Sequence, residues 1–398
     1  VRGSFHEMVV RTAVLEDRFE RIDQTSGDSP VWPGGQRYYA YGSLFMKYLM
    51  DRFGEEAMGS FVRAVAGQWV PYRLNDAAED AFGVSFSTAW QEWKAELEQR
   101  YDSLRTNLER WAPLTEGEVL SQGGYYAWSP EPSPLGNRLA FARVDGRSDP
   151  QIRIKDLETG EEAGHFRTNN LSQFSWTPAG EILFSQTRYT DSYRIRGDLH
   201  LSDSTGGTTR LTHGQRLDHP DLSPDGTRIA AVQEGRGGNR LVIVDPGSGR
   251  VEALTDFADD ELWAYPRWSP DGRWLAVSRW RPGAHYDVVI LDSSGELLWE
   301  VTEDRAIDNA PAWSPDSRWL LWSSDRSGIP NLYAVELEAE STEPGGIRQV
   351  TNLLGGGAYP SVDFGGRWIY FSSYHADGWQ IERIPFDPGS WFQPLPLH

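Results

Sequence analysis

Residues 265–278 read Tyr-Pro-Arg-Trp-Ser-Pro-Asp-Gly-Arg-Trp-Leu-Ala-Val-Ser, and this stretch decides the fold because the chain repeats it. Close and weaker copies lie at residues 128–130, 176–180, 218–232, 309–323 and 359–368. Aligned on the proline of each copy, with Phe364 in that place in the last, successive copies are 48, 46, 46, 45 and 49 residues apart. A constant period of this length is typical of propellers and solenoids.

Each copy contains the same succession of turns and short apolar runs. Ser-Pro-Asp-Gly is a tight turn, because Pro presets φ, Asp bonds the local backbone and Gly accepts a positive φ. The runs that follow, such as residues 274–277 and 319–322, are typical of strands. A short last strand ends in Leu-Thr or Val-Thr, as at residues 211–212. Four such strands cannot bury both faces of a sheet alone, so we expect six four-stranded blades packed around an axis.

The Pro-x-Trp-Ser-Pro-Asp-Gly units resemble the WD40-like repeats of the TolB-type six-bladed β-propeller over roughly residues 116–387. The resemblance is specific in the third to fifth units. In the first unit residues 131–136 expand the turn, in the second Ala179 replaces Asp, and the sixth has lost Ser-Pro. Residues 118–120 stand where a final strand would stand, and strand counting predicts that they complete the sixth blade and close the ring.

The predicted fold is therefore mainly β, with a six-bladed propeller over residues 113–398 and a small all-α domain over residues 1–112. In the α domain, apolar residues recur at three- and four-residue spacing over 39–53, 58–65 and 74–82, and Gly follows each run. A long last helix is predicted from a capping box of Thr88 and Gln91. The pattern predicts about four helices.

The α domain resembles the C-terminal half of a gluzincin-type zinc metallopeptidase domain. The resemblance rests on residues 32–35, 41–45, 81–86 and 90–93. In that family a His-Glu-x-x-His helix and a later Glu hold the catalytic zinc. Here residues 6–10 read His-Glu-Met-Val-Val, so the second His is missing. We expect no metal, cofactor or catalytic residue within this chain, and zinc only if the motif lies upstream of Val1.

The composition narrows the class of partner. Nucleic-acid-binding surfaces are basic, so the net charge of −20 argues against nucleic acid as a partner. No apolar run of 18 residues is present, so no transmembrane segment is predicted. The chain has no Cys and no Gly-x-Ser-x-Gly motif, which excludes thiol chemistry and argues against an α/β-hydrolase nucleophile. The acidic loop 256–261 lacks EF-hand spacing, and we interpret it as solvated rather than calcium-binding.

The residues just before the innermost strand of each unit are predicted to meet near the axis on one face, the propeller mouth. They are Arg216, Asp218, His219, Trp263, Tyr265, Asp308, Asn309 and Tyr359. Trp, Tyr, Arg and carboxylates suit a protein or peptide anchor, and TolB-type propellers engage partners by this face. The alternative, that these side chains line a water-filled channel and bond one another, stays open.

Three functions remain open at this point. The first is a non-catalytic protein- or peptide-binding module, which the resemblance assigns to the periplasm or cell envelope. The second is the C-terminal portion of a zinc metallopeptidase, with the propeller gating or docking substrate. The third is a carbohydrate-binding propeller that uses exposed aromatic side chains. The oligomeric state does not follow from the sequence.

Overall fold

The computed structural model describes residues 4–25, 27, 31–121, 125–170, 173–203, 206–283, 285–338 and 344–396. The chain divides into two compact units. One comprises Val1–Pro113 with His375–Asp377, and the other comprises Leu114–Tyr374 with Gly378–His398. We describe each unit by itself.

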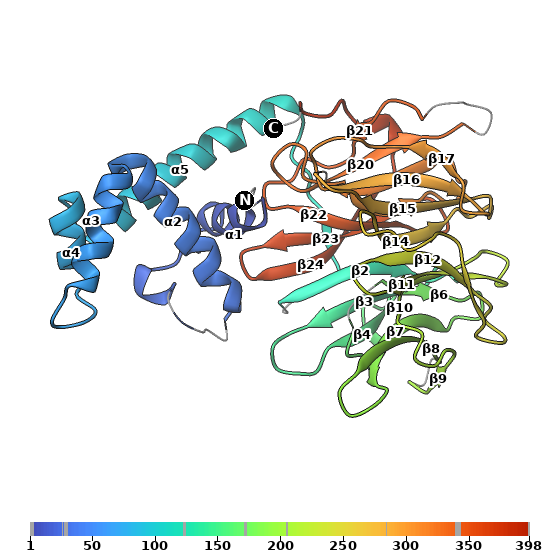
Figure 1. The fold of residues 1–398 in the computed structure, drawn as a ribbon. Helices are drawn as coiled ribbons and strands as arrows, with labels where there is room; N and C mark the ends of the chain where they lie inside the picture. Colours follow the sequence, from blue (N-terminus) through green and yellow to red (C-terminus); the bar gives the residue numbers. More distant parts are fainter. Residues whose placement is uncertain are drawn as a thin grey trace. The chain divides into compact units, whose positions relative to one another are not determined.

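The first unit is helical (Figure 1). Its helices are α1 (Ser4–Leu15), α2 (Arg37–Phe53), α3 (Glu55–Ala66), α4 (Leu74–Phe82) and α5 (Phe86–Trp111), with 3-10 turns at Ile22–Gln24 and Gly34–Gln36. The sequence pattern missed α1. It also placed the start of α5 three residues late, because the N-cap is Ser85, whose Oγ accepts from the Thr88 amide at 3.1 Å. Trp90 is buried against Phe45, with ring centroids 4.8 Å apart.

The second unit contains six four-stranded antiparallel sheets, which confirms the predicted propeller. Blade 1 contains β2 (Tyr126–Pro132), β3 (Arg138–Val144), β4 (Gln151–Asp156) and β5 (Glu162–Arg167). Blade 2 contains β6 (Ser175–Trp176), β7 (Ile182–Tyr189), β8 (Ile195–Ser202) and β9 (Thr208–Arg210). Blade 3 contains β10 (Leu217–Leu222), β11 (Ile229–Glu234), β12 (Asn239–Val244) and β13 (Val251–Ala253).

The remaining blades follow the same plan. Blade 4 contains β14 (Leu262–Trp268), β15 (Trp274–Trp280), β16 (Tyr286–Asp292) and β17 (Leu297–Glu300). Blade 5 contains β18 (Asn309–Trp313), β19 (Trp319–Ser324), β20 (Asn331–Glu336) and β21 (Arg348–Gln349). Blade 6 contains β22 (Gly357–Val362), β23 (Trp368–His375), β24 (Gly378–Pro385) and β1 (Glu118–Val119), and a 3-10 turn, Pro388–Ser390, follows it.

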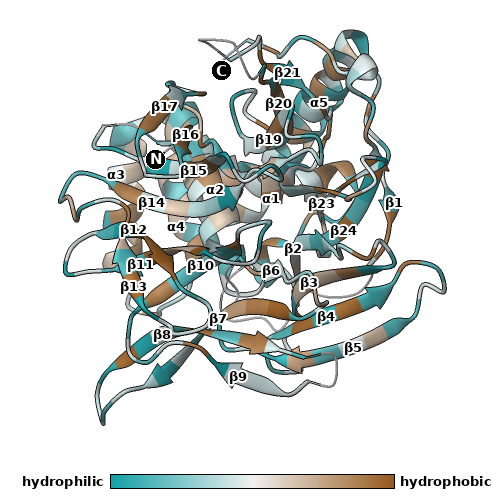
Figure 2. Cartoon of the chain, turned by 90° about the vertical axis from the view of Figure 1, so that its right-hand side faces the viewer, coloured by the Kyte–Doolittle hydropathy of each residue, from teal (hydrophilic) through white to brown (hydrophobic). Residues whose placement is uncertain are grey.

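The blades follow one another around a common axis in chain order (Figure 2). The first strand of each blade lies at the edge of its sheet, and neighbouring first strands touch: β2 contacts β22, β22 contacts β18, β18 contacts β14, β14 contacts β10, and β10 contacts β6. These six first strands are therefore the innermost ones. The ring closes as the strand count predicted, because β1 pairs with β24 through Glu118–Arg383 and Val119–Glu382.

One buried cluster lies between each pair of consecutive blades. Between blades 4 and 5, Trp274 stacks on Trp313 with centroids 5.8 Å apart, and Trp322 is fully buried beside them. The last cluster joins blade 6 to blade 1 through Tyr370 and Phe141. Burial of apolar area is the main favourable term in folding, so each blade depends on its two neighbours for its core.

The Ser-Pro-Asp-Gly turns behave as their residue types predict. In blade 4 the Gly272 amide donates to the Ser269 carbonyl at 2.8 Å, and Gly272 has a φ of 72°. The Ser269 hydroxyl donates to Asp271 at 2.6 Å and accepts from the Trp274 amide at 3.0 Å. Asp271 also accepts from the Arg273 amide at 3.1 Å. Serine and aspartate thus satisfy the turn backbone that the strands leave unpaired.

The turn of the first blade differs from the sequence alignment. It is not an expanded loop starting at Ser129-Pro130, because β2 continues to Pro132 and the turn is Ser133–Gly136, closed by the Gly136 amide on the Ser133 carbonyl at 2.9 Å. The repeat is therefore anchored on Pro134. Ser129-Pro130 belongs to the innermost strand.

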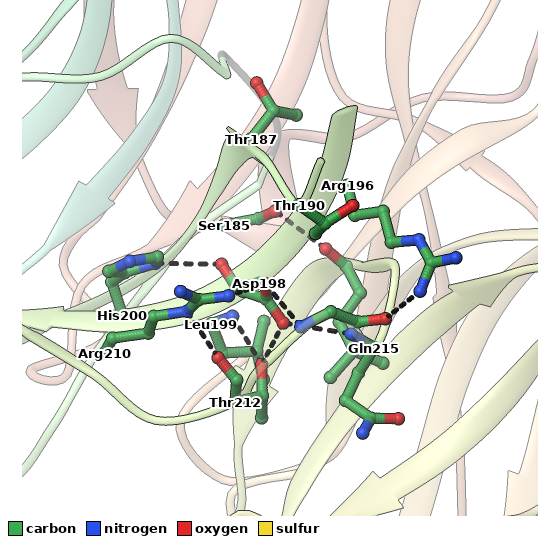
Figure 3. A network of polar contacts seen from close by, with 12 residues as sticks. Ser185, Thr187, Thr190, Arg196, Asp198, Leu199, His200, Arg210, Thr212 and Gln215 are labelled. Atoms are coloured by element: carbon green, nitrogen blue, oxygen red, sulfur yellow. Dashed lines mark hydrogen bonds and ion pairs between the residues drawn. The ribbon is translucent and has the colours of Figure 1, made fainter. Parts of the chain in front are cut away.

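In blades 2, 4 and 5 a threonine just after the last strand bonds a polar side chain of the third strand. In blade 2 the Thr212 hydroxyl donates to the buried Asp198 carboxylate at 3.0 Å and accepts from the Leu199 amide at 3.0 Å (Figure 3). Thr302 with Asp287 and Thr351 with Asn331 repeat this bond in blades 4 and 5. The threonine replaces ladder bonds that the short outer strand cannot supply.

We predict that Gly272→Val and Asp271→Ala each destabilise the propeller. A β-branched residue at a φ of 72° costs about 1–2 kcal/mol, and loss of the aspartate bonds costs about 1 kcal/mol. Urea unfolding measures both effects. Gly164→Val, at a strand position of blade 1 with open space around its Cβ, is the control and should not destabilise. Equal midpoints for Gly272→Val and Gly164→Val would contradict the turn assignment.

We predict that Thr212→Val destabilises by about 1–3 kcal/mol, because it leaves the buried Leu199 amide and Asp198 carboxylate each short of one partner. Thr208→Val, at an exposed position of β9, is the matched control. Urea unfolding of both variants is the measurement. A loss of stability no greater in Thr212→Val than in Thr208→Val would refute this role of the Leu-Thr motif.

Candidate functional site

A bulge near the middle of the innermost strand directs side chains to the axis. In blade 4 the pairing jumps from Ala264–Ser278 to Arg267–Ala276, so Tyr265 and Pro266 together oppose one residue of β15. Tyr265 has a φ of 55°. Proline, which cannot donate to a ladder, is found in sheets at such bulges, and bulges re-aim side chains.

The bulge recurs in five blades at the residue that precedes the proline. These residues all have φ between 49° and 55°: Ser129, His219, Tyr265, Ala310 and Tyr359. A positive φ in a non-glycine residue costs of order 1–3 kcal/mol and is commonly retained at functional sites. With Gln173 of blade 2 they form what we call the upper ring. Two residues further along each strand lies the lower ring, made of Glu131, Ser175, Asp221, Arg267, Ala312 and Ser361.

Aromatic side chains dominate the upper ring. Because blade 5 contributes only Ala310, Tyr265 and Tyr359 from the flanking blades meet, with ring centroids 5.9 Å and hydroxyls 3.5 Å apart. His219 packs on Tyr265 at 4.5 Å. Trp128, which precedes the ring residue of blade 1, packs edge-to-face on Tyr359 at 6.1 Å.

The lower ring contains an ion cluster. Arg267 of blade 4 pairs with Glu131 of blade 1 across the axis and with Asp221 of blade 3 at 3.1 Å. The Ser361 hydroxyl donates to Glu131 at 3.3 Å, and the Trp268 amide donates to Asp221 at 2.7 Å. The cluster joins four of the six blades.

Two carboxylates share one guanidinium in this cluster, and the pKa of each carboxyl group is raised above its ordinary value. Burial raises the pKa of Glu131 to about 7, against the attraction of Arg267 and with the repulsion of Asp221. Burial also raises the pKa of Asp221. Burial alone would lower the pKa of Arg267, but the two carboxylates outweigh it and raise that pKa. Burial therefore favours the protonated form of each of these carboxyl groups, while Arg267 favours the ionised form.

The two rings divide the axis into compartments. Between them the free volume is about 10 Å³, roughly the space of one water molecule. Beneath the lower ring, toward the Ser-Pro-Asp-Gly turns, lies a cavity of about 130 Å³. On the other side of the upper ring lies a cavity of about 300 Å³, which we call the mouth pocket. It is lined by Trp128, Ser129, Asn170, Gln173, Asp218, His219, Tyr265 and Tyr359.

Comparison with known families agrees with this geometry. A family model described as the TolB beta propeller domain matches residues 184–391, just over half of the chain. The chain belongs to this TolB β-propeller family. The match covers blades 3 to 5 completely and the strands β22, β23 and β24 of blade 6.

Individual relatives are more distant. An uncharacterized peptidase, YuxL of Bacillus subtilis, is 26% identical over 172 residues, which is 42% of this chain and only 24% of the peptidase. Among solved structures, a putative TolB from Agrobacterium tumefaciens is 16% identical over 67% of this chain and 94% of its own, with a TM-score of 0.48. TolB from Acinetobacter baumannii is 19% identical over 68% of this chain and 56% of its own, with a TM-score of 0.41.

The TolB propeller brings four of the eight predicted mouth residues together. Asp218, His219, Tyr265 and Tyr359 all line the mouth pocket. Asp218 Oδ1 accepts from the Asn170 amide group at 3.2 Å and from the His219 backbone at 2.8 Å. Burial lowers the pKa of His219, more than the nearby Asp218 and Glu234 raise it, which favours the neutral ring.

The other four predicted residues lie outside this pocket. Asp308 is fully buried, accepts from Trp322 Nε1 at 2.9 Å and has its pKa raised to about 6 by burial. Trp263 is 5% exposed in the cluster between blades 3 and 4. The backbone carbonyl of Arg216 accepts a hydrogen bond from the Glu234 amide, and Asn309 is paired with Ser323 in the sheet of blade 5.

The prediction missed the contribution of blades 1 and 2 and the whole lower ring. Ser129 was assigned to a turn, although its position before Pro130 matches that of Tyr265 before Pro266. The residue after the proline, the x of Pro-x-Trp-Ser-Pro, is the lower-ring position. It lies two residues after the upper-ring residue, and side chains two apart on a strand lie on the same face. This spacing is the signal that would have identified Glu131, Asp221 and Arg267.

Features of other site classes are not found in the described part of the chain. No group of three His, Asp or Glu residues is arranged there to hold a metal ion, and this includes the acidic loop 256–261. His6 lies on α1, and Val10, which occupies the place of the second zinc ligand, is fully buried. Among the described helices, none is both long and apolar enough to cross a membrane.

We predict that Arg267→Gln destabilises the propeller by about 3–5 kcal/mol, because it leaves two buried carboxylates without their cation. The loss should grow as pH rises from 5 to 8. The folded pKa of Glu131, about 7, exceeds its ordinary 4.5, so the folded state holds an extra proton between these values. Stability from this proton is present below 4.5 and is lost as pH rises through 7.

Without Arg267 the folded pKa rises further, so the slope becomes steeper and reaches higher pH. Urea unfolding at several pH values from 5 to 8 measures this. Arg318→Gln, which breaks an exposed pair with Glu336, is the control and should show a small loss that does not depend on pH. A loss of stability in Arg267→Gln that does not change with pH would refute the raised pKa of Glu131 and the extra proton of the folded state.

Proposed function

We propose that this chain is a protein- or peptide-binding module of the TolB propeller type, and that the mouth pocket holds part of its partner. The observation that carries the proposal is the convergence of aromatic and polar side chains from blades 1, 2, 3, 4 and 6 on one pocket of about 300 Å³. Ligand pockets of this size are usually lined by aromatic side chains with a few placed polar groups.

Backbone strain supports a functional role for the pocket. Ser129, His219, Tyr265 and Tyr359 all reach it from bulges with a positive φ. A water-filled channel would not require this conformation, which costs free energy in every blade that has it. A rigid ring of strands also preorganises the side chains, and preorganisation reduces the entropy lost on binding.

The side chains favour binding over catalysis. Ser129, Asp218 and His219 are the three types found in a nucleophilic triad, but Asp218 bonds the backbone amide of His219 rather than its ring. Within the described residues the buried Nδ1 of His219 has no hydrogen-bond partner. A general base needs a group that orients its ring, so this histidine is not prepared for that role.

The closed axis argues against passage of a substrate through the propeller. The Tyr265–Tyr359 contact and the Arg267 cluster leave only about 10 Å³ between the rings. A partner would enter the mouth pocket and stop at the tyrosines. By the family resemblance we also propose that binding takes place in the periplasm or at the cell envelope.

The test is a selection of displayed random heptapeptides on the immobilised chain, followed by titration of the enriched peptides in solution. Ser129→Tyr installs at blade 1 the side chain that blades 4 and 6 carry at the same bulge, and fills the pocket. We predict that it weakens binding of the enriched peptides at least tenfold, without unfolding the propeller.

Ser293→Tyr, in an exposed turn of blade 4, is the matched control and should bind as the unaltered chain does. Combined substitution of Asp218, Tyr265 and Tyr359 should weaken binding as Ser129→Tyr does. Enriched peptides that bind Ser129→Tyr undiminished, or a selection that enriches none, would count against the mouth pocket as the binding site.

A second candidate is an accessory domain of a peptidase, and the relative named as a peptidase is the observation that favours it. The chain matches about a quarter of that relative, so the activity of the whole peptidase belongs to this chain only as a proposal. Intact mass and zinc content of the protein from its native source would test it. A longer chain with about one zinc per molecule would support a zinc peptidase, and a chain of this length without zinc would remove that candidate.

A further inference from the structure

We infer that the mouth pocket recognises an organic cation, an ammonium or guanidinium group presented by a peptide. This inference rests on the proposed function and specifies the chemistry of the partner. It starts from the composition of the pocket wall, to which aromatic side chains and one carboxylate contribute.

The aromatic part of the wall has the arrangement of a cation cage. The Tyr359 ring lies at 65° to the Trp128 ring and at 65° to the Tyr265 ring in two edge-to-face contacts, so it faces a different direction from both of them. His219 continues the wall from Tyr265 at 4.5 Å. Cations bind over aromatic faces, with Trp the strongest and Tyr next, and such cages recognise ammonium groups.

The single charge of the wall has the sign that a cation needs. Asp218 uses Oδ1 for both of its described hydrogen bonds, to Asn170 and to the backbone of His219. Its Oδ2 therefore stays available to a ligand. Among the described lining residues no Lys or Arg is present, so no side chain of the wall competes for this carboxylate.

Arg267, the nearest buried cation, does not cancel the negative charge that Asp218 contributes to the pocket. Arg267 lies beneath the tyrosines and pairs with both Glu131 and Asp221, so its charge is directed to these two carboxylates and not to the pocket. Burial lowers the pKa of His219, so its ring stays neutral near pH 7. The net charge of the whole chain, −20, would draw a cationic partner toward it from a distance.

The proposed function makes a peptide the source of the cation. His219 Nδ1 and Trp128 Nε1 are buried without a partner among the described residues and do not reach the surface of the pocket. The cation is therefore bound by the aromatic rings and by the Asp218 carboxylate, and the rest of the peptide lies outside the cage.

The experiment uses four small probes on the intact chain, followed through the indole N–H signal of Trp128 by NMR and assigned with Trp128→Phe. Nα-acetyl-lysinamide presents only a side-chain ammonium, alaninamide only a terminal ammonium, and Nα-acetyl-argininamide a guanidinium. Nα-acetyl-norleucinamide is the neutral analogue of the first, with the same four side-chain carbons and no ammonium group. We expect at least one cation to bind tenfold or more tightly than norleucinamide, and the tightest of the three identifies the source.

Asp218→Asn keeps the size and the Oδ1 acceptor of the side chain, and should weaken cation binding about tenfold. Asp256→Asn removes the same charge from an exposed loop and should leave binding unchanged. Equal binding of norleucinamide and lysinamide, no shift of the Trp128 signal by any probe, or equal losses in the two variants would overturn the inference. Enriched heptapeptides that need the pocket but carry no cation would overturn it while leaving the proposed function intact.

Discussion

Burial of each blade against its neighbours is the interaction on which the rest of the propeller depends. A four-stranded sheet of six-residue strands has two apolar faces and no core of its own, so its tryptophans are covered only when another blade stacks on them. The ring must then close, or two faces stay exposed. Two residues of β1, Glu118 and Val119, provide that closure by pairing with β24.

The same constraint creates the site. Six innermost strands that run side by side around an axis bring equivalent positions of the repeat into rings, and a bulge before each proline turns those positions inward. Functional difference can then be introduced at two positions per blade without altering the cores between blades. Blade 5 illustrates this freedom, because Ala310 and Ala312 occupy its ring positions while Trp313 maintains the packing.

The repeat allowed prediction of the blades because turn chemistry and strand alternation are local. It did not allow prediction of side-chain direction at the bulges, since the left-handed conformation of Tyr265 depends on pairing register with β15. A second Ser-Pro pair near Ser129 misled the alignment of blade 1. Helix α1 escaped detection because Met8 to Ala13 are all buried, so no apolar stripe alternates with polar residues. Four of the eight residues predicted for the mouth line the mouth pocket, and the sequence reasoning missed the ion cluster of the lower ring.

The position of the closing strand has a mechanical consequence. β1 follows α5 after only six residues, so any tension carried along the chain from α5 reaches the propeller first at Thr115, which exchanges two hydrogen bonds with Asn352, and then at Glu118 and Val119. Glu118 and Val119, with the Glu118–Arg383 ion pair, form a small clasp within blade 6, whereas each of the other five blades takes its four strands from one continuous stretch of chain. The clasp is the seam at which a pulled ring would open first, while the ion cluster across the axis would still hold blades 1, 3 and 4 together.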